Sequence, residues 1–157
     1  MSSVRLACEN DIPRLADLLS QVLKVHHELR PDLFKANCRK YNDRELFAMI
    51  GNELRPVFVY TDDNDVVMGY AFCVIEQHPG NNILTDIKTL YLDDLCVDES
   101  MRGKGIGKKL YEHIKSYARE IGCHNLTLNV WEGNESALKF YKSLGLVPYK
   151  YGMETIL

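Results

Sequence analysis

The chain has 157 residues, of which 46% are hydrophobic and 26% are charged, and its formal net charge is -3. This length is enough for one domain with a single core, so we expect residues 1–157 to fold as one domain. The slightly acidic balance argues against a general nucleic-acid binder, which normally carries a basic face.

The cysteines are odd in number and widely spaced, at positions 8, 38, 73, 96 and 123. Without a Cys-x-x-Cys pair they indicate neither a disulfide framework nor a zinc site, and they are typical of a reducing compartment. The first residues lack the apolar region of a signal peptide, and no apolar run reaches the roughly 18 residues of a membrane span. We therefore expect a soluble cytoplasmic protein with no membrane or nucleic-acid partner.

The N-terminal third predicts a strand at Val4–Ala7 and two helices. Asn10, Asp11 and Pro13 are start signals for the first helix, and a second, short helix is predicted from Asp43. Between them, residues 26–41 show no clear period. The second helix is expected to face inward with Leu46, Phe47, Ile50 and Leu54.

Strands follow at 57–61 and 66–77, joined by an Asp-Asp-Asn-Asp turn of residues that tolerate left-handed backbone. The run Leu90–Val97 alternates as a third strand of this region. Alternation places Leu90, Leu92, Asp94 and Cys96 on a core face and Tyr91, Asp93, Leu95 and Val97 on the other, unless a bulge near Leu95 turns Asp94.

A glycine-rich turn, Arg102-Gly-Lys-Gly-Ile-Gly107, joins this strand to an amphipathic helix that runs from Ile106 to Ile121. Glycines let the backbone approach a ligand, and the free N–H groups and positive dipole end of a helix favour phosphate oxygens. The spacing fits neither the P-loop nor the dinucleotide fingerprint. Cationic charge near the turn comes from Arg102, Lys104, Lys108 and Lys109.

A further strand is predicted at 126–130, a helix capped by Asn134 and closed by Gly145, and a last strand at 149–156. Strands and helices thus mix as an α+β fold. The strand before residue 97 and the strand from 126 should pair in parallel, because a helix crosses between them.

The glycine turn resembles the pyrophosphate loop of the GNAT superfamily of N-acetyltransferases, Arg/Gln-x-x-Gly-x-Gly/Ala. A second segment, Trp131–Gly145, is similar to the family pattern Asn-x-x-Ala-x-x-Phe-Tyr-x-x-x-Gly through Asn134, Ala137, Phe140 and Tyr141. The resemblance covers residues 66–150. It implies a single-domain, mixed, mostly antiparallel sheet with splayed central strands flanked by helices, acetyl-CoA as cosubstrate, and it allows a homodimer.

Site residues are carried over from this resemblance. The residues that it implies for acetyl-CoA binding are Leu95, Cys96, Val97, Arg102, Gly103, Lys104, Gly105, Ile106, Gly107, Lys108, Asn134, Ala137 and Tyr141. Asn134, Ala137 and Tyr141 also share one helix face, which suits a cofactor surface. Without the resemblance, Tyr141 would be read as a packing residue.

An acetyl acceptor must be an uncharged amine, and a primary amine with a pKa of about 10.4 loses its proton at pH 7 at a cost of about 4.6 kcal/mol. Asp93 resembles the acidic position that some family members use to accept this proton through water, and Tyr141 is the predicted acid. Three roles for Asp93 stay open: it is the base, it binds the amine, or it is an ordinary solvated charge at a strand edge. Glu28, Tyr91 and Asp93 are the predicted acceptor-binding residues, while His26 and His27 are weak evidence for a metal, and none is predicted.

The leading hypothesis is an acetyl-CoA-dependent N-acetyltransferase in which a primary amine of a small molecule or peptide attacks directly in a ternary complex. The alternatives are a non-catalytic acyl-CoA-binding regulatory module, which would bind CoA without releasing thiol, and a structural dimerisation domain with no CoA affinity. The identity of the amine does not follow from the sequence.

Overall fold

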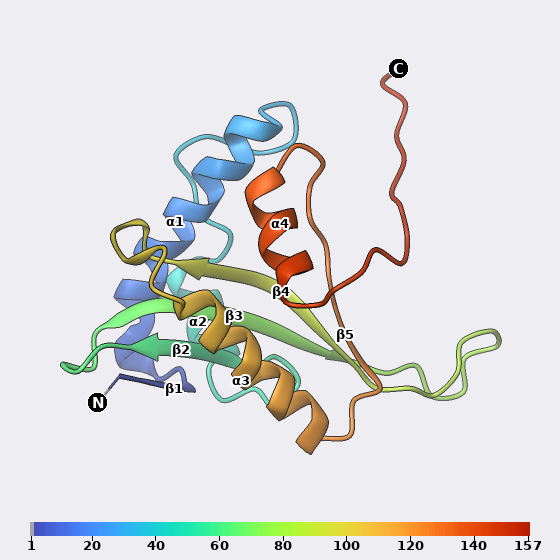
Figure 1. The fold of residues 1–157 in the computed structure, drawn as a ribbon, viewed down its shortest axis with the longest axis horizontal. Helices are drawn as coiled ribbons and strands as arrows, with labels where there is room; N and C mark the ends of the chain where they lie inside the picture. The colour runs from blue at the N-terminus through green and yellow to red at the C-terminus, as the bar shows by residue number, and fades with distance from the viewer. Residues whose placement is uncertain (1) are drawn as a thin grey trace.

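The computed structural model describes residues 2–157, which form a five-stranded sheet flanked by four α-helices (Figure 1). Among these residues, no helix combines the length and the apolar character needed to cross a membrane. The strands are β1 (Ser3–Leu6), β2 (Val57–Thr61), β3 (Val67–Glu76), β4 (Thr89–Val97) and β5 (Asn125–Leu128); the helices are α1 (Ile12–Leu29), α2 (Asp43–Met49), α3 (Ile106–Glu120) and α4 (Glu135–Ser143), with 3-10 turns η1 (Glu9–Asp11) and η2 (Glu99–Met101).

The strands lie in the sheet in chain order, from β1 at one edge to β5 at the other. Neighbours from β1 to β4 are antiparallel, and only β4 and β5 pair in parallel, with α3 as the crossover between them. The predicted α+β class, the mixed and mostly antiparallel sheet and the parallel pair are therefore confirmed.

Helices cover both faces of the sheet, and β2 shows how the sequence divides between them. Val57 and Val59 pack with α1 and α2, whereas Phe58 and Tyr60 pack with α3. Successive side chains of a strand point to opposite faces, so a strand with helices on both sides is buried at every position, as β2 is. In Figure 1, α3 lies across the near face of the sheet.

The helix predicted from Asp43 exists, but two of its expected inward-facing residues are exposed. Its buried residues are Leu46 and Met49, three positions apart on one face. Phe47 is one residue further round the helix than Leu46 and therefore points to solvent, and Leu54 lies beyond the helix end; their exposed fractions are 57% and 63%. The prediction for Phe47 and Leu54 was wrong.

The last strand predicted at 149–156 is also absent. Residues 147–157, which we call the C-terminal tail, have no regular secondary structure, and each of them is exposed. Figure 1 shows the tail leaving the end of α4 and standing away from the sheet. A strand needs a neighbour to satisfy its backbone groups, and no described strand lies beside the tail.

Candidate active site

The strands β4 and β5 separate halfway along β4, which creates a cleft. Their pairing ends at Leu92 and Leu128, while β4 continues to Val97. The backbone of residues 93–97 is therefore not paired on the β5 side. The predicted splay of the central strands is confirmed. The cleft encloses about 930 Å³ and is lined by residues of α1, the segment before α2, β4, the glycine turn and α4.

A β-bulge lies in β4 at the start of this splayed part. Leu92 pairs with Cys73 and Asp94 with Phe72, so Asp93 is the extra residue. The bulge reverses the alternation, because one inserted residue exchanges the two faces. Leu90 and Leu92 accordingly pack with α3, whereas Cys96 packs with α1. The prediction that Cys96 shares a face with Leu90 and Leu92 was wrong.

Asp93 is held by two side chains from the segment between α1 and α2. The Tyr41 hydroxyl donates to Asp93 Oδ2 at 2.6 Å, and Lys40 Nζ lies 2.9 Å from the same oxygen. Arg55 in turn donates to the Tyr41 hydroxyl at 3.4 Å. Burial, followed by the hydrogen bond to Asp93, raises the pKa of Tyr41. An acidic side chain in the cleft is thus already paired with a primary ammonium group.

Asp94 lines the same cleft in a less polar environment. Its Oδ2 accepts a hydrogen bond at 3.0 Å from the hydroxyl of Tyr70, a core residue. Desolvation outweighs the nearby Lys40 charge and this hydrogen bond, and raises the pKa of Asp94 to about 6. The bulge therefore places two consecutive carboxylates in one cleft with different surroundings.

The glycine turn enters the cleft from the other side. Gly103 and Gly105 have φ values of 79° and 76°, a region that favours glycine, and Gly105 is the N-cap of α3. The first intrahelical bond of α3 runs from Lys109 N to Gly105 O, which leaves the preceding N–H groups at the helix start. Among the nearby cations, Arg102 and Lys108 line the cleft.

The other two cations of the turn point elsewhere. Lys104 Nζ lies 3.4 Å from Met101 Sδ on the exposed surface, and Lys109 Nζ lies 3.5 Å from the Tyr60 hydroxyl. Gly107 has a different role from Gly103 and Gly105. A Cβ at Gly107 would lie 3.0 Å from Phe140 Cζ, so its lack of a side chain lets α3 and α4 pack closely.

Helix α4 contributes the predicted acid. The Asn134 side chain caps α4 by accepting from Ala137 N at 3.2 Å, and Asn134, Ala137 and Tyr141 all line the cleft. Burial, followed by the charge of Asp94, raises the pKa of Tyr141, which keeps its hydroxyl protonated at neutral pH. Among residues 2–157, the Tyr141 hydroxyl has no hydrogen-bond partner.

Most other predicted site residues also border the cleft. Leu95, Cys96, Val97 and Ile106 line it, although the Cys96 side chain turns into the core. Tyr91 lines it as well, and its hydroxyl accepts a hydrogen bond from Asn129 Nδ2 at 3.1 Å. Glu28 is exposed on α1 and, like Lys104, does not line the cleft.

The sequence analysis missed Lys40, which lines the cleft, and Tyr41 and Tyr70, whose hydroxyls donate to Asp93 and Asp94. Lys40 and Tyr41 lie in the segment without periodicity, and Tyr70 reads only as a strand residue. Asp94 was seen but assigned to the core face. An aromatic wall of Phe34 with His26 and Trp131, at ring distances of 5.1 and 5.4 Å, completes the mouth. Within the described residues, no cluster of side chains could hold a metal.

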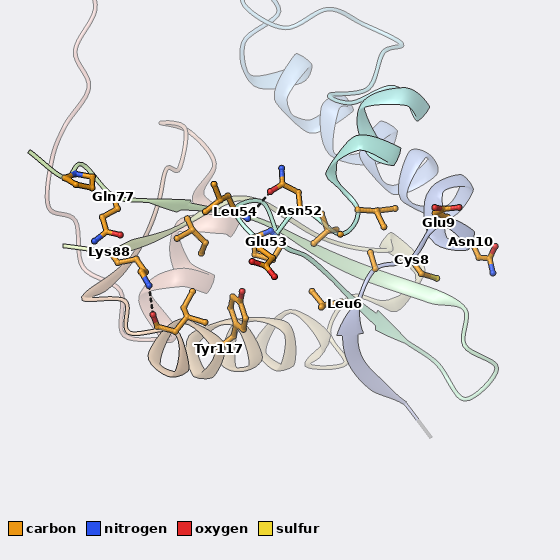
Figure 2. Close-up of a pocket in the computed structure, with 18 residues that line it drawn as sticks. Leu6, Cys8, Glu9, Asn10, Asn52, Glu53, Leu54, Gln77, Lys88 and Tyr117 are labelled. Carbon is orange, nitrogen blue, oxygen red and sulfur yellow. Dashed lines mark hydrogen bonds between the residues drawn. The ribbon is translucent and has the colours of Figure 1, made fainter. Parts of the chain in front are cut away.

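A second cavity, which we call the groove, lies at the other end of the sheet (Figure 2). It encloses about 1210 Å³ between β1, the turn after α2 and the end of α3. Its Lys88 Nζ donates to Ile121 O at 2.8 Å, which anchors the end of α3. The groove is larger than the cleft, but no glycine turn at a helix start and neither Asp93 nor Asp94 lines it.

A splayed β4–β5 pair, with a glycine turn at a helix start on one side and carboxylates on the other, defines the class of CoA-dependent acyltransferases. The sequence profile of the acetyltransferase (GNAT) family matches residues 22–146, and the chain belongs to that family. It is an acetyl-CoA-dependent N-acetyltransferase. The chain is therefore an enzyme and not the non-catalytic module that the sequence left open.

Three similar proteins belong to the comparison with known sequences and structures. Peptidyl-lysine N-acetyltransferase YjaB of Salmonella typhimurium is 33% identical over 147 residues, covering 92% of this chain and 83% of its own. Thialysine N-epsilon-acetyltransferase of Mus musculus is 26% identical over 137 residues, covering 86% and 76%. The crystal structure of a mutant BH1408 protein from Bacillus halodurans is 34% identical, covers 99% of both chains and has a TM-score of 0.93.

Proposed function

We propose that the enzyme acetylates a cationic primary amine of the lysine side-chain type, on a small molecule or a peptide, by direct attack in a ternary complex. The observation that carries the proposal is the β4 bulge, which brings Asp93 and Asp94 into one cleft with Tyr141. The names of two similar proteins, a thialysine and a peptidyl-lysine N-acetyltransferase, specify amines of this kind.

In this proposal the diphosphate of acetyl-CoA binds at the start of α3. The free N–H groups from Gly103 to Gly107 and the helix dipole favour its negative charge, and Arg102 and Lys108 add cations. The unpaired edge of β4 at Leu95–Val97 offers backbone groups to the pantetheine arm. Asn134 and Ala137 border the path of the arm from α4.

Asp93 binds the incoming ammonium group. Its present partner, Lys40 Nζ at 2.9 Å, is itself a primary ammonium, and this ion pair supports the role. Asp94 then takes the proton, directly or through water. A pKa near the working pH makes a carboxylate an effective base, and the pKa of Asp94 is raised to about 6. We therefore divide between two residues the roles first considered for Asp93 alone.

The chemical step follows from these positions. The neutral amine nitrogen attacks the thioester carbonyl, an N–C bond forms, and the carbonyl electron pair moves to its oxygen. The nitrogen of this tetrahedral intermediate gives its second proton to water, the C=O double bond forms again, and the C–S bond breaks. The departing CoA thiolate takes the proton of the Tyr141 hydroxyl, which has no other partner among residues 2–157. Solvent returns the proton to Tyr141, and the acetylated amine leaves without positive charge, so Asp93 no longer holds it.

The proposal also includes one catalytic domain over residues 1–157, a cytoplasmic location and a homodimer. All five cysteines are free thiols, as expected in a reducing compartment.

A thiol-release screen tests the acceptor class. Acetyl-CoA is incubated with lysine, thialysine, a lysine peptide blocked at its N-terminus, polyamines, aminoglycosides and peptides with a free N-terminus. We expect turnover with the ε-amines, together with a raised KM in Asp93→Asn and a lowered kcat in Asp94→Asn. Turnover confined to α-amines or aminoglycosides would contradict the proposal.

A further inference from the structure

Lys40 brings a primary amine of the chain itself into the cleft. Its Nζ lies 2.9 Å from Asp93 Oδ2 and 5.5 Å from the centre of the Tyr41 ring. Among the described residues that line the cleft, two are lysines, and the other, Lys108, lies at the start of α3 on the side proposed for the diphosphate. Lys40 is therefore the lysine that contacts the carboxylate to which we assign the incoming acceptor.

The segment between α1 and α2 holds Lys40 beside this carboxylate. His27 Nδ1 of α1 lies 2.7 Å from Phe34 O, which ties the first part of the segment to the helix. At the other end, the Tyr41 ring packs against the ring of Phe72, a core residue of β3, with 5.4 Å between the ring centres. Lys40 directly precedes Tyr41, so its side chain starts from an anchored part of the backbone.

The ion pair itself leaves the amine of Lys40 mobile. The Lys40 side chain is 41% exposed and that of Asp93 is 16% exposed. A partly exposed ion pair contributes little to stability, and a lysine carries its amine on a flexible four-carbon stem. The ammonium group can therefore leave Asp93 and move within the cleft while the backbone stays in place.

The groups of the proposed chemical step interact electrostatically with Lys40. Burial raises the pKa of Asp94, and the charge of Lys40 opposes this effect. Burial also raises the pKa of Tyr141, and the charge of Asp94 adds to it. An amine, the proposed base and the proposed acid thus lie together in one cleft, and all three belong to the same chain.

We propose that Lys40 is a self-acetylation site, which the enzyme modifies with its own acetyl-CoA when no external amine occupies the cleft. This inference rests on the proposed function, because it uses the same base, acid and cosubstrate. Lys40 Nζ lies where we place the acceptor ammonium and is the same chemical group. The chain therefore carries an acceptor of the proposed class inside its own site.

The step balances in the same way as transfer to an external amine. Asp94 takes a proton from the Lys40 ammonium, directly or through water, and the neutral nitrogen attacks the thioester carbonyl. The nitrogen of the tetrahedral intermediate gives its second proton to water, the C–S bond breaks, and the CoA thiolate takes the proton of the Tyr141 hydroxyl. The products are an amide at Lys40 Nζ and the free thiol of CoA.

Acetylation of Lys40 changes the acceptor site. The amide carries no charge, so it ends the ion pair with Asp93 and frees this carboxylate for an external ammonium group. We expect the acetylated enzyme to have a KM for a cationic amine up to about fivefold lower than the unmodified enzyme. A KM that is unchanged or raised would overturn this activating role.

Peptide mapping by mass spectrometry tests the modification. The full chain is incubated with acetyl-CoA and no amine, and acetyl groups are located before and after incubation. Lys35 is the internal control, because it belongs to the same segment, is exposed and does not line the cleft. We expect acetylation at Lys40 to be at least about tenfold faster than at Lys35, since the base and the acid act only on an amine in the cleft.

Two further measurements distinguish catalysis within one chain from chemical labelling. Tyr141→Phe should slow acetylation of Lys40 at least about tenfold and leave that of Lys35 unchanged. The fraction of Lys40 modified per unit time should not depend on protein concentration. Equal rates at Lys40 and Lys35 in a chain that binds acetyl-CoA, or a rate at Lys40 that rises with protein concentration, would overturn the proposal.

Thiol release with external amines, measured on the same samples, separates this inference from the acceptor class. Turnover of lysine-type amines by a chain in which Lys40 stays unmodified would overturn the self-acetylation and leave the proposed function standing. Rapid modification of Lys40 without turnover of any lysine-type amine would overturn the acceptor class and leave the self-acetylation standing.

Discussion

The cleft and the groove are both large and mostly apolar, yet only the cleft combines neighbouring carboxylates with a glycine turn at a helix start. The groove encloses about 1210 Å³ and the cleft about 930 Å³, so volume alone would select the wrong one. In the groove, the charged Lys88 is already used to hold the end of α3. In the cleft, two strands separate, a helix begins, and a bulge turns two carboxylates inward.

The difference lies in the backbone. A strand that loses its neighbour exposes peptide groups, and a helix that starts at a glycine leaves its first N–H groups free. Both occur together at the cleft, whereas the helical start that borders the groove is capped, because Cys8 N donates to Asp11 Oδ2 at 2.8 Å. The following experiments change residues of the cleft, with control substitutions outside it where the chain offers them, and they are ordered from the largest expected effect to the smallest.

Replacing Asp94 by asparagine should lower kcat/KM for the amine about 100-fold at pH 7, because a general base typically contributes that much or more. In the native enzyme, kcat/KM should fall as the pH drops below about 6, where Asp94 becomes protonated and can no longer accept a proton. Asp94→Asn should lose this inflection, and Asp93→Asn should keep it. An inflection that survives in Asp94→Asn would assign the base elsewhere.

The same substitution should stabilise the fold. The folded-state pKa of Asp94 is raised from 3.8 to about 6, so its contribution to stability falls as the pH rises through this interval. At pH 7 the ionised carboxylate is unfavourable in the folded state, and an amide removes the charge. We expect Tm of Asp94→Asn to exceed that of the native protein at pH 7 by more than at pH 4, as measured by calorimetry.

Gly105→Val should reduce CoA affinity by about 100-fold, because the side chain blocks the approach of the diphosphate to the backbone N–H groups. Gly80→Val is the matched control. Gly80 has φ 70°, close to the 76° of Gly105, and neither residue has an atom within 4 Å of an added Cβ. Both variants carry the same backbone strain, but Gly80 is remote from the cleft. Equal CoA affinities in calorimetry would remove the turn from the site.

Tyr141→Phe removes only a hydroxyl, and kcat should fall at least about tenfold while CoA affinity and Tm hardly change. Tyr117→Phe makes the same change in the groove and should leave kcat unaltered. Single-turnover measurements ensure that chemistry is observed. Near-native turnover of Tyr141→Phe would make Tyr141 a packing residue, with water as the acid.

Lys40→Met should lower KM for a cationic amine by up to about fivefold, since a partly exposed ion pair contributes about 1 kcal/mol or less. Lys40 competes with the acceptor for Asp93, so its removal frees the carboxylate. Lys24→Met, on the exposed surface of α1, is the control for net charge. A higher KM in Lys40→Met would instead mean that Lys40 helps to hold the acceptor.

The parts of the site that could be predicted from the sequence are contiguous. The glycine turn, the helix after it and the Asn134–Tyr141 face are set by local spacing, and the structure places them together. Tyr41, whose hydroxyl donates to Asp93, lies 52 residues before it in the chain. Both Tyr41 and its neighbour Lys40 belong to a segment that has no hydrophobic periodicity. No pattern in the sequence predicts such a contact, because the contact depends on how the segment after α1 covers the sheet.

Two errors have a common physical origin, since both concern strand pairing. The alternation of β4 is interrupted at Asp93, and an inserted residue changes the face of every side chain after it without altering the hydrophobic composition. Residues 149–156 have the composition of a strand, but a strand exists only where another strand accepts its hydrogen bonds. Pairing is a property of two segments, and one segment read alone cannot reveal it.

The close approach of Gly107 and Phe140 joins the glycine turn to the helix that carries Tyr141. Phe140 precedes Tyr141 in α4, and its ring lies against the backbone of Gly107 in the first turn of α3. In the proposed mechanism, a diphosphate bound at the start of α3 would lie one packing contact away from the turn of α4 that carries Tyr141. If acetyl-CoA binds as proposed, the cofactor loop and the hydroxyl that protonates the leaving thiolate are therefore coupled through one packing contact.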